Sequence, residues 1–260
     1  MVETMIKAIV LTNWWLFPVL LLLWLLQLPV VKGMLGELFV NLRLWLFLDK
    51  RLYKRLANVT IPVIDGSTQI DHLVVSVFGI FVIETKNMRG WIFGSADQAQ
   101  WTQKIFKKTS RFQNPLRQNY KHTKAIEALT GTEPEQVHSV VVFTGDASFK
   151  TPMPSNVLYV DRLIRYIKAF KQPVFTEEEV ERLLEMILSQ RLAATRQTHK
   201  AHVANLQARN DVNAARLCPR CGESLVVREV RSGPHAGEKF WGCSAYPKCR
   251  TVQKIMSDVR

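Results

Sequence analysis

Long runs of apolar residues, broken at a few positions by charge, dominate the first half of the chain. Residues 8–31 carry no charged side chain, and a helix of that length would be about 36 Å long, enough to cross a hydrocarbon core of about 30 Å. A cleaved signal peptide is the alternative, but the run is longer than such peptides need and Gln27-Leu28-Pro29 offers no small-residue cleavage site. The pattern therefore predicts a retained transmembrane anchor in residues 1–32.

Basic residues on the two sides of this segment predict its orientation. Lys7 precedes it, whereas Lys and Arg recur six times between residues 32 and 55. The positive-inside rule then places everything after residue 32 in the cytoplasm. We expect a single-pass protein of the inner (cytoplasmic) membrane with soluble domains in the cytoplasm, tethered through residues 8–31.

Beyond residue 32, the apolar pattern predicts strands that alternate with helices. Residues 33–57 are typical of a helix, and their apolar run at 38–48 is too short to span a membrane, so we expect it to pack on a sheet. The alternative is that residues 38–48 also contact the membrane. Such an order indicates an α/β domain over residues 33–172, followed by a helix and a polar linker over 173–215. Strands are expected at 59–64, 70–77, 80–86, 90–94, 100–103, 137–144 and 157–160, and helices after Asn114-Pro115, over 161–170 and from Thr176.

The strands on either side of Phe78-Gly79 form a hairpin that carries three charges in apolar surroundings. With the turn centred between those two residues, Asp71 faces Lys86. Because side chains alternate with period two, Asp71, Glu84 and Lys86 then share one face at the open end of the hairpin.

Two interpretations of these charges are open from the hairpin alone. Uncompensated buried charge costs several kcal/mol, and a structural Asp–Lys or Glu–Lys pair would avoid that cost. The other interpretation is a divalent-metal site, with Asp71 and Glu84 as oxygen ligands. Lys86 would then orient or polarise a water molecule or the scissile phosphate.

The amino-acid composition predicts that the protein has a polyanionic partner. The chain has 35 Lys and Arg against 22 Asp and Glu, a net charge of +13, which favours nucleic acid or an anionic membrane surface. No acid occurs between residues 101 and 125, where aromatic and basic residues are interleaved. This pattern fits phosphate contact plus base stacking, with a solvated basic loop as the alternative. The residues expected to contact nucleic acid there are Lys104, Lys107, Lys108 and Arg111.

The cysteines form one local group near the C-terminus, which predicts a zinc ribbon over residues 216–260. Their spacing is C-x2-C, 21 residues and C-x5-C, which provides the two pairs of a tetrahedral Zn²⁺ site. Disulfides are the alternative, and a cytoplasmic location disfavours them. His199 and His202 in the linker have no further ligands nearby and are expected to be solvated. The expected zinc ligands are Cys218, Cys221, Cys243 and Cys249.

A set of landmarks recurs in the order found in a known domain: Gly36-Glu37, IDHLVV at 70–75, GIFVIETKN at 79–87, Gly90, Trp101, Asn114-Pro115 and Gln118. Over about residues 33–150 the chain resembles the NERD (nuclease-related) domain, which is similar to the PD-(D/E)xK restriction-endonuclease-like nucleases. The resemblance implies a restriction-endonuclease-like mixed sheet flanked by helices.

The resemblance also implies roles for the charged hairpin. Asp71 corresponds to the metal-binding aspartate and Glu84 to the second carboxylate, with the Thr85 carbonyl as a further oxygen ligand. Lys86 corresponds to the catalytic lysine. Mg²⁺ (or Mn²⁺) is the implied cofactor, because hard cations prefer oxygen ligands.

Two helix residues complete the implied site. Glu37 matches a helix-borne acid that often completes such centres. Gln118 resembles the glutamine of the Q-x-x-x-Y motif of RecB-like nucleases, although His122 stands where the tyrosine would be. Gln118 and His122 are four residues apart and share one face of the expected helix.

Residues 218–250 resemble the C4 zinc ribbon at the C-terminus of bacterial type I DNA topoisomerases, which implies contact with DNA, most often single-stranded. Phe240, Trp241 and Tyr246 would stack on bases, while Arg228 and Lys248 would meet phosphates. Alternatively, the aromatic rings pack over the zinc site.

The sequence thus predicts a membrane-anchored, Mg²⁺-dependent nuclease that hydrolyses DNA, with a zinc ribbon that binds DNA. The alternative is a non-catalytic, membrane-tethered nucleic-acid-binding protein that uses a nuclease-like scaffold. An apo structure with the Asp71 and Glu84 carboxylates far apart would support the alternative. A third possibility is that the basic surfaces bind anionic lipid beside the anchor.

Overall fold

The computed structural model describes residues 16–63, 66–192, 216–218, 220–230, 237 and 239–254. The chain divides into two compact units. The larger one contains residues 1–62 and 68–192, and the smaller one contains residues 63–67 and 193–260. The expected linker, including His199 and His202, lies outside the described residues.

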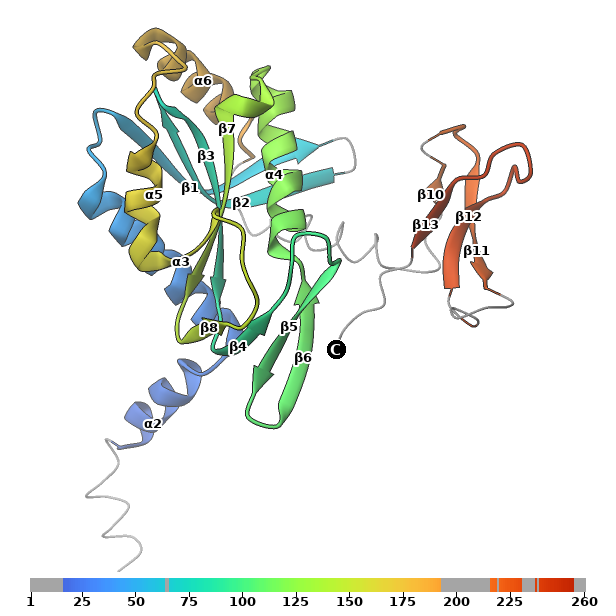
Figure 1. Ribbon diagram of the computed structural model, residues 1–260, viewed down its shortest axis with the longest axis horizontal. Coiled ribbons are helices and arrows are strands. Elements are labelled where there is room, and N and C mark those ends of the chain that lie inside the picture. The colour runs from blue at the N-terminus through green and yellow to red at the C-terminus, as the bar shows by residue number, and fades with distance from the viewer. Residues whose placement is uncertain are drawn as a thin grey trace, which may run out of the picture. The chain divides into compact units, whose positions relative to one another are not determined.

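A five-stranded mixed sheet forms the centre of the larger unit (Figure 1). Its order is β1-β2-β3-β7-β9, with β2 antiparallel to β3, and β3, β7 and β9 parallel to one another. The strands are β1 (Tyr53–Val63), β2 (Gly66–Ser76), β3 (Gly79–Asn87), β7 (Val137–Thr144) and β9 (Val157–Tyr159).

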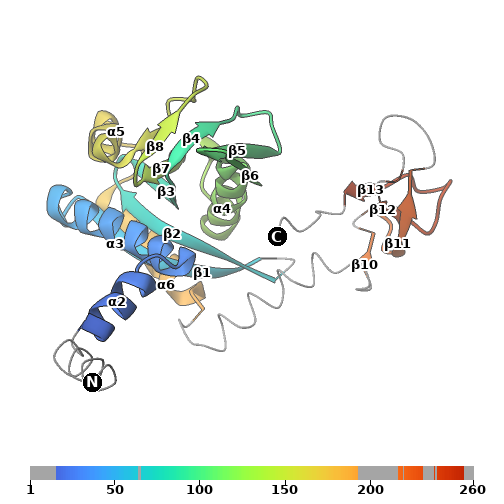
Figure 2. The same cartoon turned by 90° about the horizontal axis from the view of Figure 1, so that it is seen from below.

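Helices cover both faces of this sheet (Figure 2). Helices α3 (Pro29–Phe47) and α5 (Leu163–Ala169) pack on the face that carries Val74 and Phe81. Helices α4 (Pro115–Thr130) and α6 (Glu177–Gln190) pack on the face that carries Leu73 and Val82. Because β2 and β3 are apolar on both faces, both must be covered, and the mixed α/β class expected from the sequence is confirmed. Helix α6, which we assigned with the linker, belongs to this core.

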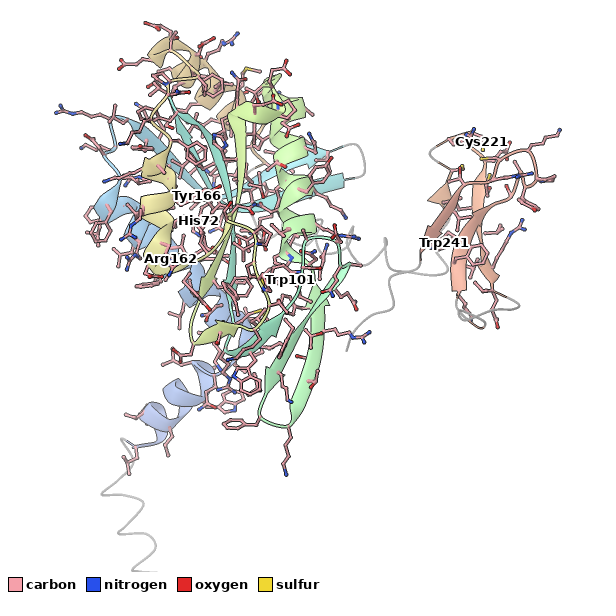
Figure 3. All side chains as sticks on the ribbon, in the orientation of Figure 1. His72, Trp101, Arg162, Tyr166, Cys221 and Trp241 are labelled. Atoms are coloured by element: carbon pink, nitrogen blue, oxygen red, sulfur yellow. The ribbon has the colours of Figure 1, made fainter. Side chains whose placement is uncertain are left out.

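A second, four-stranded sheet follows β3 along the chain, in the order β6-β5-β4-β8. Its core contains Trp101, whose ring is stacked at 11° on Phe143 with a centroid distance of 6.3 Å (Figure 3). Gly94 leaves room for that ring, since a Cβ there would lie 2.3 Å from it. The strands are β4 (Gly90–Phe93), β5 (Gln100–Ile105), β6 (Lys108–Gln113) and β8 (Ala147–Phe149).

The central hairpin turns one residue earlier than predicted, at Val77-Phe78. Ser76 pairs with Gly79, and the Ser76 hydroxyl donates to the Gly79 carbonyl and accepts from the Phe78 N–H, at 3.1 and 3.2 Å. Gly79 has a φ of 125°, a conformation that glycine adopts without strain. The pairing therefore differs by two residues from the expected one, which keeps the same side chains on each face.

The predicted helix over residues 33–57 is wrong in its second half. Helix α3 ends at Phe47 and β1 begins at Tyr53, so Lys54 and Arg55, whose charge would suit a helix C-terminus, lie on a strand. Arg55 lies on β1 but still stabilises the helix C-terminus, because its guanidinium donates a 2.8 Å hydrogen bond to the Leu44 carbonyl. Strand β1 accordingly begins six residues before the strand expected at 59–64.

The predicted anchor is described only in part, since its residues 8–15 lie outside the described chain. Three residues separate helix α2 (Leu16–Leu25) from Pro29, where α3 starts, so the described part of the segment is not one continuous helix. Among the described residues, no helix has both the length and the apolarity needed to cross a membrane.

Most remaining expectations are confirmed, including β4, β5, β7, β9 and the capping box of Thr176 and Glu179 at α6. Residues 161–170 instead begin as a 3₁₀ turn, η2 (Val160–Arg162), before α5. Strands β6 and β8 were missed because one is half-exposed and polar and the other has three residues.

Candidate nuclease site and zinc site

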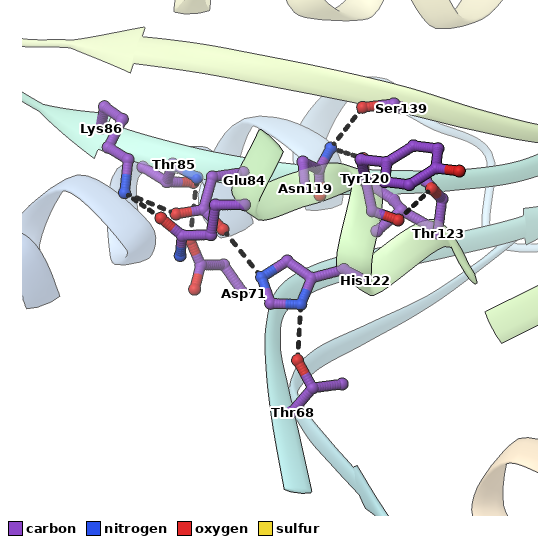
Figure 4. A network of polar contacts seen from close by, with 12 residues as sticks. Thr68, Asp71, Glu84, Thr85, Lys86, Asn119, Tyr120, His122, Thr123 and Ser139 are labelled. Carbon is purple, nitrogen blue, oxygen red and sulfur yellow. Dashed lines mark hydrogen bonds and ion pairs between the residues drawn. The ribbon is translucent and has the colours of Figure 1, made fainter. Parts of the chain in front are cut away.

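The open end of the β2–β3 hairpin brings the predicted carboxylates and lysine together (Figure 4). The pairing of His72 with Ile83 places Asp71 next to Glu84 across the strands. The Lys86 ammonium donates to Glu84 Oε1 at 2.7 Å, and Asp71 Oδ2 accepts the Thr85 N–H at 2.8 Å. Glu84 is 2% exposed, so its charge is compensated by protein groups rather than by bulk water.

Helix α4 adds two side chains one turn apart. Gln118 Oε1 accepts a second hydrogen bond from Lys86 at 3.0 Å. His122 places Nε2 3.3 Å from Glu84 Oε2, and its Nδ1 lies 2.8 Å from the Thr68 hydroxyl. The site therefore includes His122 and Thr68, which the sequence analysis did not include among the site residues. The four-residue spacing of Gln118 and His122 was the one available signal.

Asn119 fixes α4 against the sheet between these two residues. It is fully buried, and its amide donates to the Val82 carbonyl at 2.8 Å, the Ser139 hydroxyl at 2.9 Å and the Val140 carbonyl at 3.1 Å. The bonds reach both β3 and β7. They hold the helix at one height along the sheet, so Gln118 meets Lys86 and His122 meets Glu84.

Helix α3 brings Glu37 to the site from the other face of the sheet. Gly36 is buried, and a Cβ there would lie 2.7 Å from Thr144 Oγ1 and 2.8 Å from Asn87 Cβ. The Asn87 amide also donates to the Lys32 carbonyl at 2.6 Å. This close approach explains the glycine next to Glu37, whose pKa is raised by burial and by the Glu84 charge, against the lowering effect of Lys86.

The four cysteines of the smaller unit fit a zinc ion. Their sulfur atoms all lie within 4.8 Å of one another, and tetrahedral coordination at about 2.3 Å implies sulfur separations of roughly 3.8 Å. The Cys218–Cys249 and Cys221–Cys243 distances are 3.7 and 3.4 Å, too long for a disulfide bond of about 2.05 Å. The cysteines are free, which agrees with a zinc ribbon.

Comparison with known proteins identifies both modules. Residues 32–144 match the nuclease-related domain, and residues 215–258 match the topoisomerase DNA binding C4 zinc finger. Uncharacterized protein pXO1-01 of Bacillus anthracis is 42% identical over 165 residues, covering 62% of this chain and 77% of the relative. The chain belongs to the NERD family.

Further similarity of this NERD protein is confined to a short segment. Uncharacterized protein YrdD of Escherichia coli (strain K12) is 45% identical over 40 residues, covering 15% of the chain and 19% of YrdD. No solved structure matches the chain significantly. The resemblance expected from the landmarks and from the cysteine spacing is thus confirmed for both modules, whereas the division at residues 32, 172 and 215 stays a prediction.

The NERD site holds more carboxylates than cations. Burial, Glu84 and Glu37 raise the pKa of Asp71 to about 8, although the Thr85 N–H and Lys86 act in the opposite direction. Burial would also raise the pKa of Glu84, but His122 and Lys86 outweigh it and hold that pKa below the usual value. The pKa values of the two neighbouring carboxyl groups are therefore shifted in opposite directions, so that Glu84 is ionised and Asp71 is protonated near neutral pH.

This imbalance fits a divalent cation at the NERD site. Asp71, Glu84 and the Thr85 carbonyl offer the hard oxygen atoms that Mg²⁺ and Mn²⁺ prefer, and a cation would remove the reason for Asp71 to hold its proton. Within the described ranges, the four cysteines are the one group of three or more potential ligands close enough to share an ion. Glu37, Asp71 and Glu84 are thus near one another but do not converge on a single point.

The predicted nucleic-acid contacts of the NERD unit lie on the β5–β6 hairpin, whose turn is Phe106-Lys107. Trp91 pairs with Lys104, and Lys104 with Thr109, so Lys104 and Arg111 share one sheet face with Trp91. Lys108 points to the opposite face. The structure therefore divides the predicted set of four between two faces and a turn.

Trp91 is a candidate contact that the sequence analysis missed. Its side chain is 48% exposed, with the Lys104 and Lys150 ammonium groups 5.8 and 4.9 Å from the ring centroid. Lys150 follows β8, which is parallel to β4, so no local pattern could have paired these residues. An exposed indole between two cations provides both a stacking surface and phosphate contacts.

The zinc module forms a small antiparallel sheet of β10 (Arg216–Leu217), β11 (Ser224–Glu229), β12 (Lys239–Cys243) and β13 (Val252–Lys254). Alternation along β12 turns Phe240 and Trp241 to opposite faces. Trp241 is 4% exposed and packs with Leu225 and the cysteines (Figure 3), so the placement of its ring against stacked bases is not supported.

The other predicted contacts of the zinc module are at least partly exposed. Tyr246 is 58% exposed, and the Arg228 guanidinium carbon lies 5.5 Å from its ring centroid. Phe240 is partly exposed and Lys248 is exposed. Arg228, Phe240, Tyr246 and Lys248 are therefore the candidate nucleic-acid contacts of the module that remain accessible.

Proposed function

We propose that this NERD protein is a membrane-anchored, Mg²⁺-dependent nuclease that hydrolyses DNA phosphodiester bonds, with a zinc ribbon that holds the DNA. The observation that carries the proposal is the convergence of Asp71, Glu84 and Lys86 with Gln118 on one end of the sheet. A structural ion pair requires one acid and one base. It does not require a second, protonated carboxyl group and a third acid beside the pair.

Each side chain has a distinct task in this reaction. Asp71 and Glu84 would hold Mg²⁺ or Mn²⁺, which when bound would neutralise phosphate charge and activate a water molecule. Lys86 places a positive charge where the attacking or leaving oxygen develops negative charge. Gln118 and Glu84 together fix the ammonium at 3.0 and 2.7 Å, so little reorganisation is needed during the reaction.

His122 acts through Glu84 and is a positioning residue. Its Nδ1 is 2.8 Å from the Thr68 hydroxyl and its Nε2 is 3.3 Å from Glu84 Oε2. The contact with Thr68 orients the imidazole ring, and the ring in turn restrains the carboxylate that also binds Lys86. His122 thus takes the place of the tyrosine in the Q-x-x-x-Y pattern as a group that orders the ligands.

The exposed face around Trp91 and the accessible contacts of the ribbon support DNA as the substrate. Both combine aromatic rings with cations, which suits a polyanion with unpaired bases. We therefore assign the NERD unit the cutting role and the ribbon a holding role.

The membrane location rests on the uncharged segment 8–31 and on the basic residues that follow it. The described α2 is consistent with lipid contact, because Leu20, Leu21 and Trp24 are each more than half exposed, at 59%, 56% and 58%. We propose that the chain is anchored in the inner membrane and that its nuclease and ribbon modules are in the cytoplasm.

A cleavage assay on the full chain tests the proposed reaction. We expect DNA to be degraded or nicked with Mg²⁺ or Mn²⁺ but not with a chelator, and Asp71→Asn and Lys86→Met to abolish cleavage. Asp161→Asn and Lys168→Met are matched controls, because both residues are exposed on or near α5. Cleavage that is equal in Asp71→Asn and Asp161→Asn would show that the activity comes from elsewhere.

One observation favours a second candidate, a non-catalytic nucleic-acid-binding protein on a nuclease-like scaffold. Glu37, Asp71 and Glu84 do not form a three-ligand group in the described structure. Under this alternative, the full chain binds DNA and anionic membranes, but neither Mg²⁺ nor Mn²⁺ produces cleavage of any DNA or RNA form.

A further inference from the structure

Helix α3 is apolar on two sides, and the fold covers one of them. Gly36, Val40 and Leu44 form a narrow buried stripe against the central sheet. The opposite side is exposed from Met34 to Leu46. It consists of Met34 (62% exposed), Leu35 (44%), Leu38 (62%), Phe39 (44%), Leu42 (48%), Trp45 (64%) and Leu46 (56%), which we call the outer face of α3.

The outer face is one continuous surface without an acid. At 100° per residue, its seven positions cover an arc of roughly 140° opposite the buried stripe. Asn41 borders the arc on one side and Arg43 on the other. Glu37, the one acid of the helix, lies outside the arc, on the side that meets the nuclease site.

We propose that the outer face of α3 lies in the headgroup–acyl boundary of an anionic bilayer, so that the NERD domain docks on lipid through its own surface. The inference deepens the proposed membrane location and rests on it. An interfacial helix has this composition, with aromatic and leucine side chains on the buried side and cations at the border. Soluble domains rarely expose an apolar surface of this extent.

The charges around the outer face favour lipid over a second copy of the chain. Lys32, Arg43, Lys50 and Arg51 lie on α3 or just beyond its end. A two-fold contact would bring this basic set against itself, whereas an anionic leaflet is complementary to it. Arg43 already packs its guanidinium over Phe39 and Phe47, at 5.9 and 5.5 Å, as a cation at a membrane border does when its stem is covered by apolar groups.

Continuity along the chain favours the same occupant. The exposed side chains of α2 are apolar, including Leu20, Leu21 and Trp24, and no charge occurs between residues 8 and 31. The surface that would enter the bilayer thus continues from the proposed anchor into the nuclease domain. Because α3 also carries Glu37, lipid contact and the nuclease site share one helix.

A fluorescent label on the full chain tests whether the outer face meets lipid. A cysteine replaces Leu42, and a control chain carries a cysteine at Leu188 on α6, since these leucines are 48% and 49% exposed. A second label position, Leu38→Cys, guards against a local effect at Leu42. All three cysteine variants are labelled with an NBD maleimide while the ribbon is saturated with zinc. The unsubstituted chain, treated in the same way, gives the background. They are then placed in phosphatidylcholine–phosphatidylglycerol vesicles.

We expect nitroxide lipids to quench the label at position 42 several-fold more than the label at 188, and aqueous iodide to show the reverse order. Trp45→Glu in the labelled chain should reduce nitroxide quenching at 42, whereas Glu181→Gln on α6 should not. Equal access of iodide to both labels would overturn the inference. So would protection of position 42 from both quenchers, because a second copy or residues 1–15 would then cover it.

Vesicle flotation separates this inference from the membrane location on which it rests. If the unlabelled chain does not float with vesicles, the proposed anchor fails and the docking inference fails with it. If the chain floats but position 42 is open to iodide, the anchor stands and only the outer face is assigned wrongly. Neither result depends on nuclease activity.

Discussion

Gly33 and Gly36 lie about one turn apart on α3 but have opposite surroundings. A Cβ on Gly36 would lie 2.7 Å from Thr144 Oγ1 and 2.8 Å from Asn87 Cβ, while a Cβ on Gly33 would meet no heavy atom within 4 Å. Both contacts of Gly36 are with strands of the central sheet. Gly36→Ala must therefore move α3 away from the sheet, whereas Gly33→Ala leaves the helix in place.

The difference between the two variants isolates the packing effect. Replacing a helical glycine by alanine stabilises by up to about 1 kcal/mol, and this gain is common to both positions. Overpacking at Gly36 costs about 1–3 kcal/mol. We expect Gly36→Ala to have a free energy of unfolding about 1–3 kcal/mol below that of Gly33→Ala.

Urea titration of the full chain in detergent, at equal m values, measures this difference. Glu37 follows Gly36 directly, so a shifted α3 should also lower the Mn²⁺ affinity of Gly36→Ala, while Gly33→Ala retains the original affinity. Equal free energies of unfolding in the two variants would refute the close approach of α3 to β3 and β7 and, with it, the placement of Glu37.

Three further predictions concern the metal sites and the nucleic-acid surface. Because the pKa of Asp71 is raised to about 8, a cation must displace a proton below that pH; Mn²⁺ affinity should rise with pH by up to about tenfold per unit and level off above about pH 8. Asp71→Asn should bind no Mn²⁺ at the hairpin at any pH, and an Mn²⁺ affinity of the unsubstituted chain that does not change with pH would contradict the raised pKa. Cys243→Ser should lose zinc to a chelator at far lower concentration and unfold the ribbon, measured by metal release, with no change in Mn²⁺ binding. Trp91→Ala should weaken binding to a single-stranded oligonucleotide by about 1–3 kcal/mol in fluorescence anisotropy, and Trp91→Phe should restore most of it; an unchanged affinity would leave Trp91 without a stacking role.

The shared face of Asp71, Glu84 and Lys86 was predictable because strand parity tolerates an error in the turn. The true turn is Val77-Phe78 and the pairing differs by two residues from the expected one. A difference of two leaves Asp71, Glu84 and Lys86 on the same face. A difference of one would have separated them, so the hairpin pattern alone did not guarantee the result.

For helix α3, the hydrophobic pattern predicted neither the buried side nor the C-terminal end. A helix that is apolar around most of its circumference gives no signal of which side is buried, and its end was placed ten residues too late because Lys54 and Arg55 resemble a basic helix terminus. Arg55 does meet the helix carbonyls, but from β1. The role expected of a basic residue at the helix end was correct, but Arg55 lies on a strand and not on the helix.

Contacts between distant segments could not be predicted from the sequence. His122 meets Glu84 across 38 positions, and Trp91 meets Lys150 across 59. Each pair depends on how α4 or β8 packs on the sheets rather than on any local spacing. The burial of Trp241, in contrast, follows a local pattern. Alternation along β12 places Trp241 on the opposite face of the strand from Phe240, where it is buried.

Mn²⁺ binding to the zinc-loaded full chain, followed by electron paramagnetic resonance, tests the central claim most directly. We predict a Mn²⁺ site at the hairpin that disappears in Asp71→Asn and in Glu84→Gln but persists in Asp161→Asn. Loss in the first two variants alone would assign the cation to the site where Lys86 and Gln118 converge. Identical Mn²⁺ binding by the unsubstituted chain and Asp71→Asn would contradict a metal-dependent nuclease at this hairpin.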